Sequence, residues 1–255
     1  MAKTDISLQS EGLKLKGEVY FPYSQDGETS PALCLCHGIP GGGPPDPSDP
    51  GYPALAARFS RAGFITVIFN FRGTGSSEGN FDIVGWTNDL MVVLDYLYTM
   101  SEVNRRKISV MGFSAGAAVS VYVASQDSRV SSLITCACPT QFSFASSHEN
   151  AESAIAQFRD IGIIREKDFP ASVADWIAGF NKVRPIDWIE NISPRPLLII
   201  QGTNDDVIDP ASGRALYERA GEPKEILLIE GAGHRLRHEE QAIDSAIDWL
   251  SGQVS

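Results

Sequence analysis

Apolar residues are spaced differently in the first 30 residues and in the rest of the chain. Between residues 4 and 21 they alternate with polar residues, in two runs separated by the turn-forming pair Glu11-Gly12. This alternation is typical of an antiparallel hairpin with one face in water. The later apolar runs are nearly continuous: ALCLC (32–36), FITVIF (64–69), KISVMG (107–112), LITCAC (133–138), PLLII (196–200) and EILLIE (225–230). Continuous runs predict strands covered on both faces, as in a parallel sheet flanked by helices.

The segments between these runs carry the spacing of amphipathic helices. Apolar residues recur at intervals of three and four at Trp86, Leu90, Val93, Leu94 and Leu97, and again at Ala242, Ile243, Ala246, Ile247 and Leu250. Strands that alternate with helices predict an α/β fold, with a mostly parallel twisted sheet, an N-terminal antiparallel hairpin and helices on both faces. We expect one domain spanning residues 1–255.

One segment, about residues 139–194, is longer than a simple crossover between two strands requires. It holds a heavy load of aromatic residues: Phe142, Phe144, Phe158, Phe169, Trp176, Phe180 and Trp188. We expect a short helical lid over the carboxyl edge of the sheet, with Phe142, Trp176 and Phe180 binding the substrate. In the alternative, the insertion is a packing element whose aromatic side chains are buried against the body.

Composition and charge disfavour several classes of partner. With 43% hydrophobic and 21% charged residues, the chain has the composition of a globular protein. Its net charge of −11 repels nucleic acids and anionic membrane surfaces. The first residues, MAKTDISLQSEG, lack the apolar core of a signal peptide, and no run reaches the roughly 18 apolar residues of a membrane helix. We therefore expect a cytoplasmic protein with no nucleic-acid or membrane partner.

The four cysteines form two C-x-C pairs, Cys34/Cys36 and Cys136/Cys138, which raises the question of a metal site. Each pair lies in an apolar run typical of a strand, where a reduced cysteine behaves as a small hydrophobic residue. Structural zinc sites usually space such pairs more widely. We expect buried, reduced thiols and no bound metal, in preference to a metal site or a disulfide.

The pentapeptide GFSAG (112–116) has the form G-x-S-x-G, which indicates catalysis only in the right structural context. It follows an apolar run and precedes AGAAVSVYVA (115–124), whose small residues suit a helix packed close against a sheet. Strand, turn and helix in this order hold a serine at the apex of a sharp turn with its hydroxyl exposed. We therefore predict that Ser114 is a nucleophile and not a buried spacer.

A serine hydroxyl needs a general base within hydrogen-bond reach, and the chain has four histidines. His234 follows the last predicted strand in the glycine loop GAGH, which would deliver it to the carboxyl edge of the sheet. His238 lies among charged residues and His148 lies in the predicted lid, so both are weaker candidates. His234 is the predicted base.

The imidazole in turn needs a carboxylate that fixes its tautomer. The loop after the predicted strand 196–200 offers Asp205, Asp206 and Asp209. Asp209 precedes Pro210 and is suited to capping a helix that begins there. Asp205 is our choice, and Asp206 is a rival that local spacing does not separate from it.

Acyl transfer also requires hydrogen-bond donors for the developing oxyanion. The N–H of Ala115, directly after the nucleophile, is the predicted first donor. The predicted strand 32–36 runs into His37-Gly38-Ile39, where glycine lets the backbone approach a substrate closely, so the N–H of Ile39 is the predicted second donor. We expect His37 to orient this loop by hydrogen bonding and to take no direct part in catalysis.

Together these segments resemble the α/β-hydrolase family over nearly the whole chain. The resemblance rests on HGIPGG (37–42), FNFRGTGSSEG (69–79), GFSAG, GTNDDVI (202–208) and GAGH (231–234), in the family's order of Ser, Asp and His. More narrowly, the chain is similar to small serine esterases and aminopeptidase-like hydrolases. The resemblance aligns Asp205 with the family's acid and implies an acyl-enzyme on Ser114 that needs no cofactor. It also implies that Arg72 ties loops together and does not contact substrate.

The predicted function is that of a serine hydrolase, a carboxylesterase acting on small-molecule esters with small to medium acyl groups. Serine at the turn disfavours dehalogenases and epoxide hydrolases, which resemble this family but carry aspartate there. The alternatives are a peptidase or an acyltransferase with the same residues, or a non-catalytic binding protein. A peptidase would need carboxylates near the substrate's amino end, which Asp175, Asp187 and Glu190 could supply. An exposed edge strand or the insertion could support a homodimer.

Overall fold

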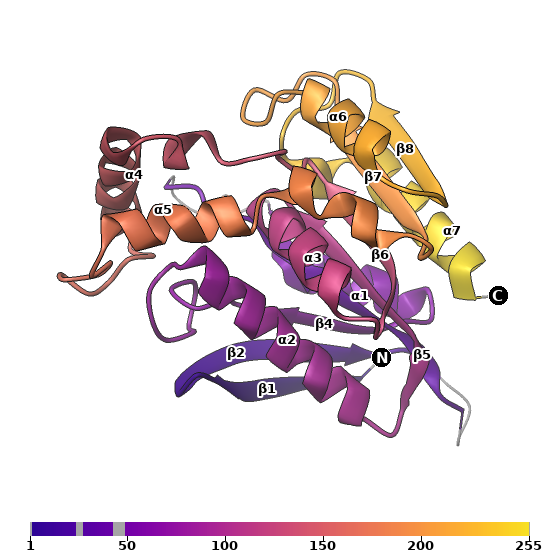
Figure 1. Ribbon diagram of the computed structural model, residues 1–255. Helices are drawn as coiled ribbons and strands as arrows, with labels where there is room; N and C mark the ends of the chain where they lie inside the picture. Colours follow the sequence, from indigo (N-terminus) through magenta and orange to yellow (C-terminus); the bar gives the residue numbers. More distant parts are fainter. Residues whose placement is uncertain (1, 24–27, 43–48, 255) are drawn as a thin grey trace.

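A mixed sheet forms the centre of the molecule (Figure 1). A computed structural model of the protein describes residues 2–23, 28–42 and 49–254. In this part of the chain the sheet has eight strands, in the order β1-β2-β4-β3-β5-β6-β7-β8. They are β1 (Ala2–Ser10), β2 (Leu13–Phe21), β3 (Ser30–Cys36), β4 (Ile65–Phe69), β5 (Val103–Phe113), β6 (Val130–Cys136), β7 (Leu197–Gly202) and β8 (Lys224–Ile229). The six later strands pair in parallel.

The first two strands form the predicted antiparallel hairpin, which joins the sheet through β2 and β4. Its turn is made by Glu11 and Gly12, with φ of 50° and 82°, as a tight two-residue hairpin turn requires. Ile6 and Val19 are buried in the main core, whereas the polar residues on the opposite face of β1 are exposed. The prediction of one wet face is confirmed for β1. On β2 the opposite face is partly covered, because Tyr20 is buried in the core on the other side of the sheet.

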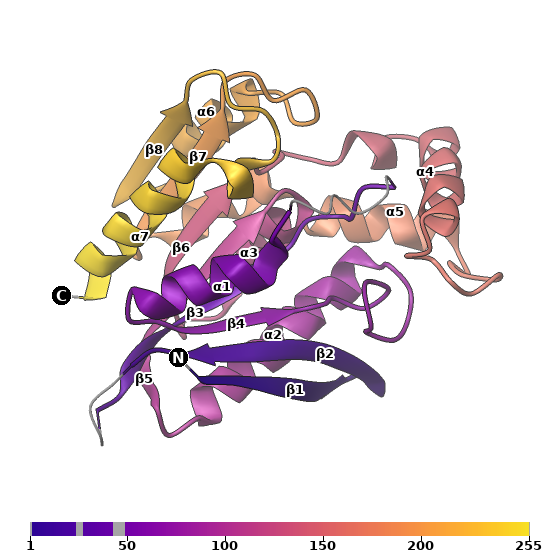
Figure 2. The same ribbon diagram turned by 180° about the vertical axis from the view of Figure 1, so that it is seen from behind.

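Helices cover both faces of the sheet, as Figures 1 and 2 show from opposite sides. One face carries α2 (Ile83–Thr99), α3 (Ala115–Gln126) and α6 (Ala211–Arg219), and the other carries α1 (Gly51–Arg61) and α7 (Glu240–Val254). The stripe predicted near residue 90 is buried along α2, with Trp86, Leu90 and Leu97 wholly inaccessible to solvent. The predicted parallel sheet with two helical layers is confirmed.

Between β6 and β7 the chain leaves the sheet, and we call residues 139–194 the cap. The cap contains α4 (His148–Asp160) and α5 (Val173–Lys182), with short 3-10 turns at Ser143–Ala145, Pro185–Asp187 and Ile189–Ile192. The hydroxyls of Ser147 and Ser172 each accept a hydrogen bond from the backbone N–H of the third residue of the helix that follows, so α4 and α5 both have side-chain caps. Figure 1 shows this helix pair extending away from the sheet.

The sheet separates two hydrophobic cores, and the cysteines lie within them. The expected burial of all four is confirmed, and burial raises the pKa of the Cys136 and Cys138 thiols. Among the described residues no group of three or more His, Cys, Asp or Glu is arranged to hold a metal ion. No helix in the described ranges combines the length and apolarity needed to cross a bilayer.

Candidate active site

Ser114 lies on a sharp turn between β5 and α3. Its backbone has φ 53° and ψ −123°, a conformation that residues with a side chain rarely adopt. The surrounding hydrogen bonds enforce it, because the Ser114 N–H donates to the Cys136 carbonyl (2.9 Å) and its own carbonyl accepts from Ala117 (2.9 Å). The side chain is half-buried at the apex of the turn. The predicted context of strand, turn and helix is confirmed.

The end of β3 packs directly against this turn. A Cβ atom at Gly116 would lie 2.3 Å from the carbonyl oxygen of His37, and a Cβ at Gly38 would lie 2.9 Å from the Cβ of Ser114. Both separations are shorter than real contacts, so only glycine fits at these positions. The loop that begins at His37 is therefore held in contact with Ser114, and we call residues 37–42 the oxyanion loop after their predicted role.

His234 and Asp205 form a close pair at the ends of β8 and β7. The imidazole Nδ1 lies 3.1 and 3.0 Å from the two carboxylate oxygens. The Asp205 side chain is fully buried, and 21% of the His234 side chain is exposed. The carboxylate favours the tautomer in which Nδ1–H donates to it, which leaves Nε2 free to accept a proton. Of the three candidate carboxylates, Asp205 is the one that contacts His234.

Further donors hold the Asp205 carboxylate in place. The N–H groups of Val207 and Ile208 donate to Oδ1 (2.9 and 2.8 Å), and the side-chain amide of Gln201 donates to Oδ2 (3.3 Å). Gln201 is fully buried at the end of β7. It was not among the predicted site residues, although a glutamine ending the apolar run LLII was a signal for such a role.

The other two aspartates of this loop have different surroundings. Asp206 is exposed. The Asp209 carboxylate accepts a hydrogen bond from the N–H of Ala211 (2.8 Å), the first residue of α6. The prediction that Asp209 is the N-cap of this helix is wrong in position, because Pro210 occupies the N-cap, although Asp209 does accept a hydrogen bond from the first helical residue.

Ser114, Asp205 and His234 follow β5, β7 and β8, so all three lie at the carboxyl edge of the parallel strands. The structure gives no hydrogen bond between the Ser114 hydroxyl and His234. Such bonds are often long in enzymes without substrate and tighten when substrate binds. The catalytic roles of the three residues stay a prediction.

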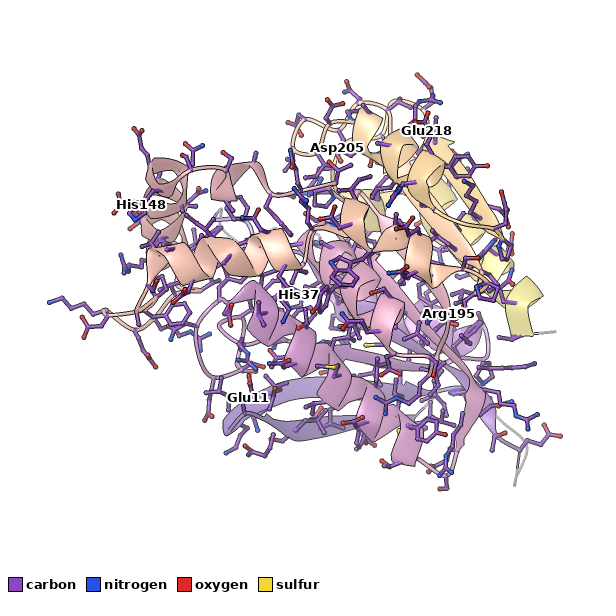
Figure 3. All side chains as sticks on the ribbon, in the orientation of Figure 1. Glu11, His37, His148, Arg195, Asp205 and Glu218 are labelled. Atoms are coloured by element: carbon purple, nitrogen blue, oxygen red, sulfur yellow. The ribbon has the colours of Figure 1, made fainter. Side chains whose placement is uncertain are left out.

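The two weaker histidine candidates are engaged elsewhere. His148 lies on α4 with 62% of its side chain exposed, 3.6 Å from Glu152, and Figure 3 shows it well apart from Asp205. His238 lies 3.6 Å from the Asp49 carboxylate. Neither has a described contact with Ser114.

His37 fixes the oxyanion loop. Its Nδ1–H donates to the Gly38 carbonyl (2.7 Å), and its Nε2 accepts from the N–H of Phe71 (3.2 Å) and lies 3.2 Å from the Thr74 hydroxyl. Burial lowers the pKa of His37, so the ring is neutral near pH 7. The predicted loop-orienting contacts of His37 are confirmed.

The two predicted oxyanion donors lie on the two segments that meet at Ser114, Ala115 at the start of α3 and Ile39 in the oxyanion loop. Ala115 is the first residue of α3, where N–H groups have no partner inside the helix. Ile39 is partly buried against the main core, two positions after His37. Neither N–H donates to another described residue. Their role as an oxyanion hole stays a prediction.

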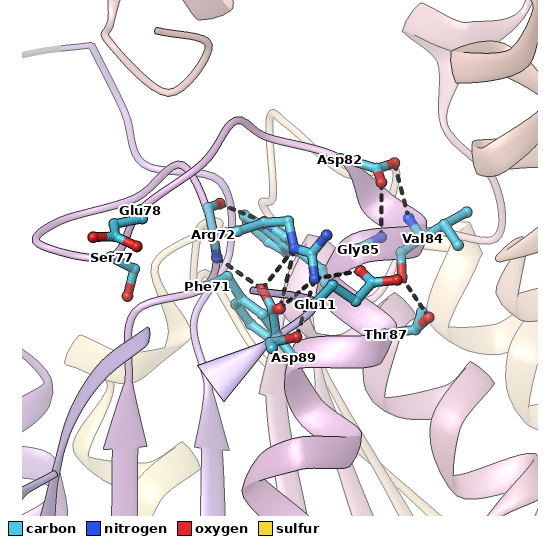
Figure 4. A network of polar contacts seen from close by, with 12 residues as sticks. Glu11, Phe71, Arg72, Ser77, Glu78, Asp82, Val84, Gly85, Thr87 and Asp89 are labelled. Atoms are coloured by element: carbon cyan, nitrogen blue, oxygen red, sulfur yellow. Dashed lines mark hydrogen bonds and ion pairs between the residues drawn. The ribbon is translucent and has the colours of Figure 1, made fainter. Parts of the chain in front are cut away.

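Arg72 is a structural residue, as predicted. Its guanidinium donates to the Asp89 carboxylate at 2.7–3.2 Å, pairs with Glu11 at 2.8 Å and donates to the Ser10 hydroxyl at 3.1 Å (Figure 4). The Asp89 side chain is fully buried and that of Arg72 is 8% exposed. This network joins the hairpin turn to α2 and to the loop that follows β4.

The cap aromatics pack against one another and against the body. The Trp176 and Phe180 ring centres lie 4.5 Å apart, and those of Phe142 and Phe180 lie 5.0 Å apart. Phe81, just before α2, contacts Phe158 and both α5 rings. The exposed fractions of Phe142, Trp176 and Phe180 are 9%, 4% and 1%. This arrangement agrees with the alternative interpretation of the insertion, in which its aromatic side chains are buried against the body. Substrate binding by these three side chains stays a prediction.

An ion pair near the base was not predicted. Asp49, before α1, pairs with Arg237, three residues after His234, and this holds the pKa of Asp49 well below its usual range. The Arg237 guanidinium also lies 5.5 Å from the centre of the Tyr52 ring. The pair ties the His234 loop to α1. Asp49 and Arg237 are 188 positions apart in the sequence. Each lies in a segment with the charge pattern of an exposed surface, so the sequence contains no indication of the pair.

A groove of about 680 Å³ opens beside the hairpin and is lined in part by His37 and Tyr52. Ser114 and His234 are not among the described residues that line it. We therefore do not assign this groove to the chemistry of Ser114.

The fold and the candidate site define a class, that of the α/β hydrolases. The comparison with protein families agrees, because residues 31–162 match the family described as alpha/beta hydrolase fold. The chain belongs to this family. Residues 186–241 also match the family described as serine aminopeptidase, S33.

Individual proteins resemble the chain over most of its length. The polyketide transferase ATR5 of Stachybotrys chlorohalonatus is 25% identical over 280 residues, which cover 92% of this chain and 90% of that protein. The α/β hydrolase GrgF from Penicillium sp. sh18 has a TM-score of 0.76 at 19% identity, with 99% of both chains covered. Est1E from Butyrivibrio proteoclasticus, solved with bound ferulic acid, has a TM-score of 0.75 at 18% identity, with 98% of this chain and 99% of that chain covered. The two structural matches show a shared fold.

Proposed function

We propose that the protein is a carboxylesterase that cleaves small to medium acyl esters through an acyl-enzyme on Ser114. The observation that carries the proposal is the His234–Asp205 pair, which lies at the same sheet edge as the strained Ser114 turn. A buried carboxylate that holds an imidazole in one tautomer is what a serine nucleophile requires. A protein that only binds ligands has no need of all three groups.

In the proposed reaction, Nε2 of His234 takes the proton of the Ser114 hydroxyl while the serine oxygen attacks the ester carbonyl. The negative charge on the carbonyl oxygen is met by the N–H groups of Ile39 and Ala115. The imidazolium, stabilised by Asp205, gives the proton to the leaving alcohol. Water then attacks the acyl-enzyme with His234 again as base, which releases the acid and restores Ser114. No cofactor takes part in these steps.

The structural relatives support an ester substrate. Est1E shares the fold over nearly the whole chain and is described with ferulic acid bound. Ferulic acid is a carboxylic acid, the kind of product that ester hydrolysis releases. In this proposal the cap shapes the acyl-binding region, with Phe142, Trp176 and Phe180 as the proposed apolar contacts.

A second candidate is acyl transfer, which the match to a polyketide transferase favours. The same acyl-enzyme would then be attacked by an alcohol or amine in place of water. A peptidase has weaker support, although part of the chain matches the S33 family. Two of the carboxylates that could bind an amino group are already paired, Asp187 with Arg184 (2.6 Å) and Glu190 with Arg219 (2.7 Å).

Hydrolysis of p-nitrophenyl esters with two to eight acyl carbons tests the proposal. We expect burst kinetics in the wild-type protein and a loss of about 10³-fold or more in Ser114→Ala. Parallel assays with aminoacyl p-nitroanilides and with added alcohol acceptors separate the peptidase and transferase candidates. Equal ester hydrolysis by wild type and Ser114→Ala would rule out the mechanism.

A further inference from the structure

The cap meets the body at the turn that follows α4, residues 161–166, which we call the cap turn. Within it, the Arg165 guanidinium donates to three backbone carbonyls of the loop after β4: Ser77 (2.7 Å), Gly73 (3.1 Å) and Gly75 (3.0 Å). We call residues 70–81 the bridging loop. No ion pair to a described carboxylate competes for Arg165: its two terminal nitrogens donate to this loop, and its Nε donates to the Gly162 carbonyl within the cap turn (3.3 Å).

Backbone contacts strengthen the same junction. The Asn80 side-chain oxygen accepts from the N–H groups of Arg165 (2.7 Å) and Glu166 (2.9 Å), and the Phe81 N–H donates to the Ile163 carbonyl (2.8 Å). A Cβ at Gly73, where φ is +79°, would lie 2.5 Å from the same Ile163 carbonyl. The cap turn is therefore seated tightly on the bridging loop.

The bridging loop also holds the oxyanion loop. The Phe71 N–H and the Thr74 hydroxyl contact Nε2 of His37, whose Nδ1–H donates to the Gly38 carbonyl. The cap turn reaches the oxyanion loop a second way, because a Cβ at Gly42 would lie 2.6 Å from a methyl carbon of Ile161. The oxyanion loop thus lies between Ser114 on one side and the seated cap turn on the other.

We propose that Arg165 is a positioning residue, which keeps the cap turn on the bridging loop and thereby fixes the oxyanion loop next to Ser114. The role rests on the proposed ester hydrolysis, because the loop would carry the Ile39 donor. A planar guanidinium suits this positioning role, because its several N–H donors contact three carbonyls at once. The compact ammonium group of a lysine would contact fewer of them. Arg165 is itself exposed, so its removal opens no cavity in the core.

Kinetic comparison of four proteins tests the proposal: wild type, Arg165→Ala, Arg165→Lys and Arg159→Ala. Arg159 is the matched control, because it is another exposed cap arginine and, within the described ranges, its side chain donates only to carbonyls of the cap, Lys167 and Phe169. With short p-nitrophenyl esters we expect kcat to fall roughly tenfold in Arg165→Ala with KM little changed, since oxyanion donors act in the transition state. Arg165→Lys should recover part of kcat, and Arg159→Ala should match the wild type.

Amide hydrogen exchange of residues 36–42 gives a second readout that does not depend on activity. We expect faster exchange there in Arg165→Ala than in Arg159→Ala. If Arg165→Ala equals Arg159→Ala in kcat, or if its kcat falls while exchange of residues 36–42 is unchanged, the positioning role is wrong. If the wild-type protein lacks hydrolysis that depends on Ser114, the proposed function fails instead, and exchange alone decides whether Arg165 restrains the loop.

Discussion

At the scale of single residues, Ser114 combines a proposed chemical role with a strained backbone. Its φ of 53° and ψ of −123° cost about 1–3 kcal/mol for a residue with a Cβ atom. The bonds to Cys136 and to the first turn of α3 hold that conformation. Strain of this kind is typical of functional sites, where it exposes a side chain that a relaxed turn would bury.

Removal of the Cβ should therefore stabilise the fold. We expect Ser114→Gly to be more stable than Ser114→Ala by about 1 kcal/mol, because both lose the hydroxyl but only glycine relieves the backbone strain. The larger conformational entropy of glycine in the unfolded chain offsets part of this gain. Urea unfolding of the two variants measures the difference. An alanine variant as stable as the glycine variant would show that the turn stores no strain.

His37 should make stability depend on pH. Burial lowers its pKa below the usual value near 6.5, so as pH falls the unfolded chain takes up a proton that the folded protein resists. The stabilisation is thus complete above about pH 6.5 and declines below it. We expect His37→Asn to reduce the slope of unfolding free energy against pH between 5 and 6.5. Identical slopes in both proteins would contradict this.

The sequence was sufficient for residues whose place follows from strand order. Ser114, Asp205 and His234 each follow a predicted parallel strand, and parallel strands end at one edge. The sequence did not reveal the Asp49–Arg237 pair, because that contact depends on how two distant loops fold over the edge. It also left Asp205 and Asp206 unresolved, since the direction of neighbouring side chains is set by the N–H groups of Val207 and Ile208.

At the scale of elements, the bridging loop connects parts of the molecule that are distant in sequence. Arg72 anchors it to the hairpin and to α2, Asn80 anchors it to the cap turn, and Phe71 anchors it to His37. Asp89, on α2, is fully buried and depends on Arg72 for its charge balance. The positions of the hairpin, α2 and the cap turn therefore all constrain the bridging loop, which in turn contacts His37 at the candidate site.

Loss of Arg72 should be severe. We expect Arg72→Met to destabilise the protein by about 3–5 kcal/mol, because the buried Asp89 carboxylate loses its only described ion-pair partner and keeps the hydrogen bond from the backbone N–H of residue 72 (2.8 Å). The exposed Arg219–Glu190 pair is the control, and Arg219→Ala should cost less than about 1 kcal/mol. Denaturant unfolding gives both values. A cost for Arg72→Met as small as that for Arg219→Ala would contradict the central position of the network.

Elements differed in how far their sequence determined them. The central strands were predictable, because strands covered on both faces have continuous apolar runs. The run 225–230 also predicted a covered strand, but it forms β8 at the edge of the sheet, where most residues are only half-buried. The cap was predictable as an insertion but not in its packing, since an aromatic residue has the same signature in a core and in a substrate pocket. Phe180 illustrates this, because its ring is surrounded by Phe81, Phe142 and Trp176 and only the folded chain shows it.

At the scale of the whole molecule, one sheet with a core on each face holds the candidate site at a single edge. The four cysteines belong to these cores and are shielded from solvent, which raises the pKa of Cys34, Cys136 and Cys138. The reactivity of the four thiols is therefore low as long as both cores stay folded.

Thiol titration should report the intact cores. We expect no rapid reaction of the native protein with a disulfide reagent at pH 8, and reaction of all four thiols after unfolding in denaturant. Spectrophotometric titration measures both. Fast reaction of any thiol in the native protein, with circular dichroism unchanged, would contradict the buried placement.

The most direct test of the central claim is covalent labelling with a fluorophosphonate, followed by intact mass and peptide mass spectrometry. This reagent reacts with serines that a base has activated, and the reaction needs no knowledge of the natural substrate. We expect one label per wild-type chain, on Ser114, much slower labelling of His234→Ala, and none at this site in Ser114→Ala. An unlabelled wild-type protein, or a label that persists equally in Ser114→Ala, would contradict the claim that Ser114 is an activated nucleophile.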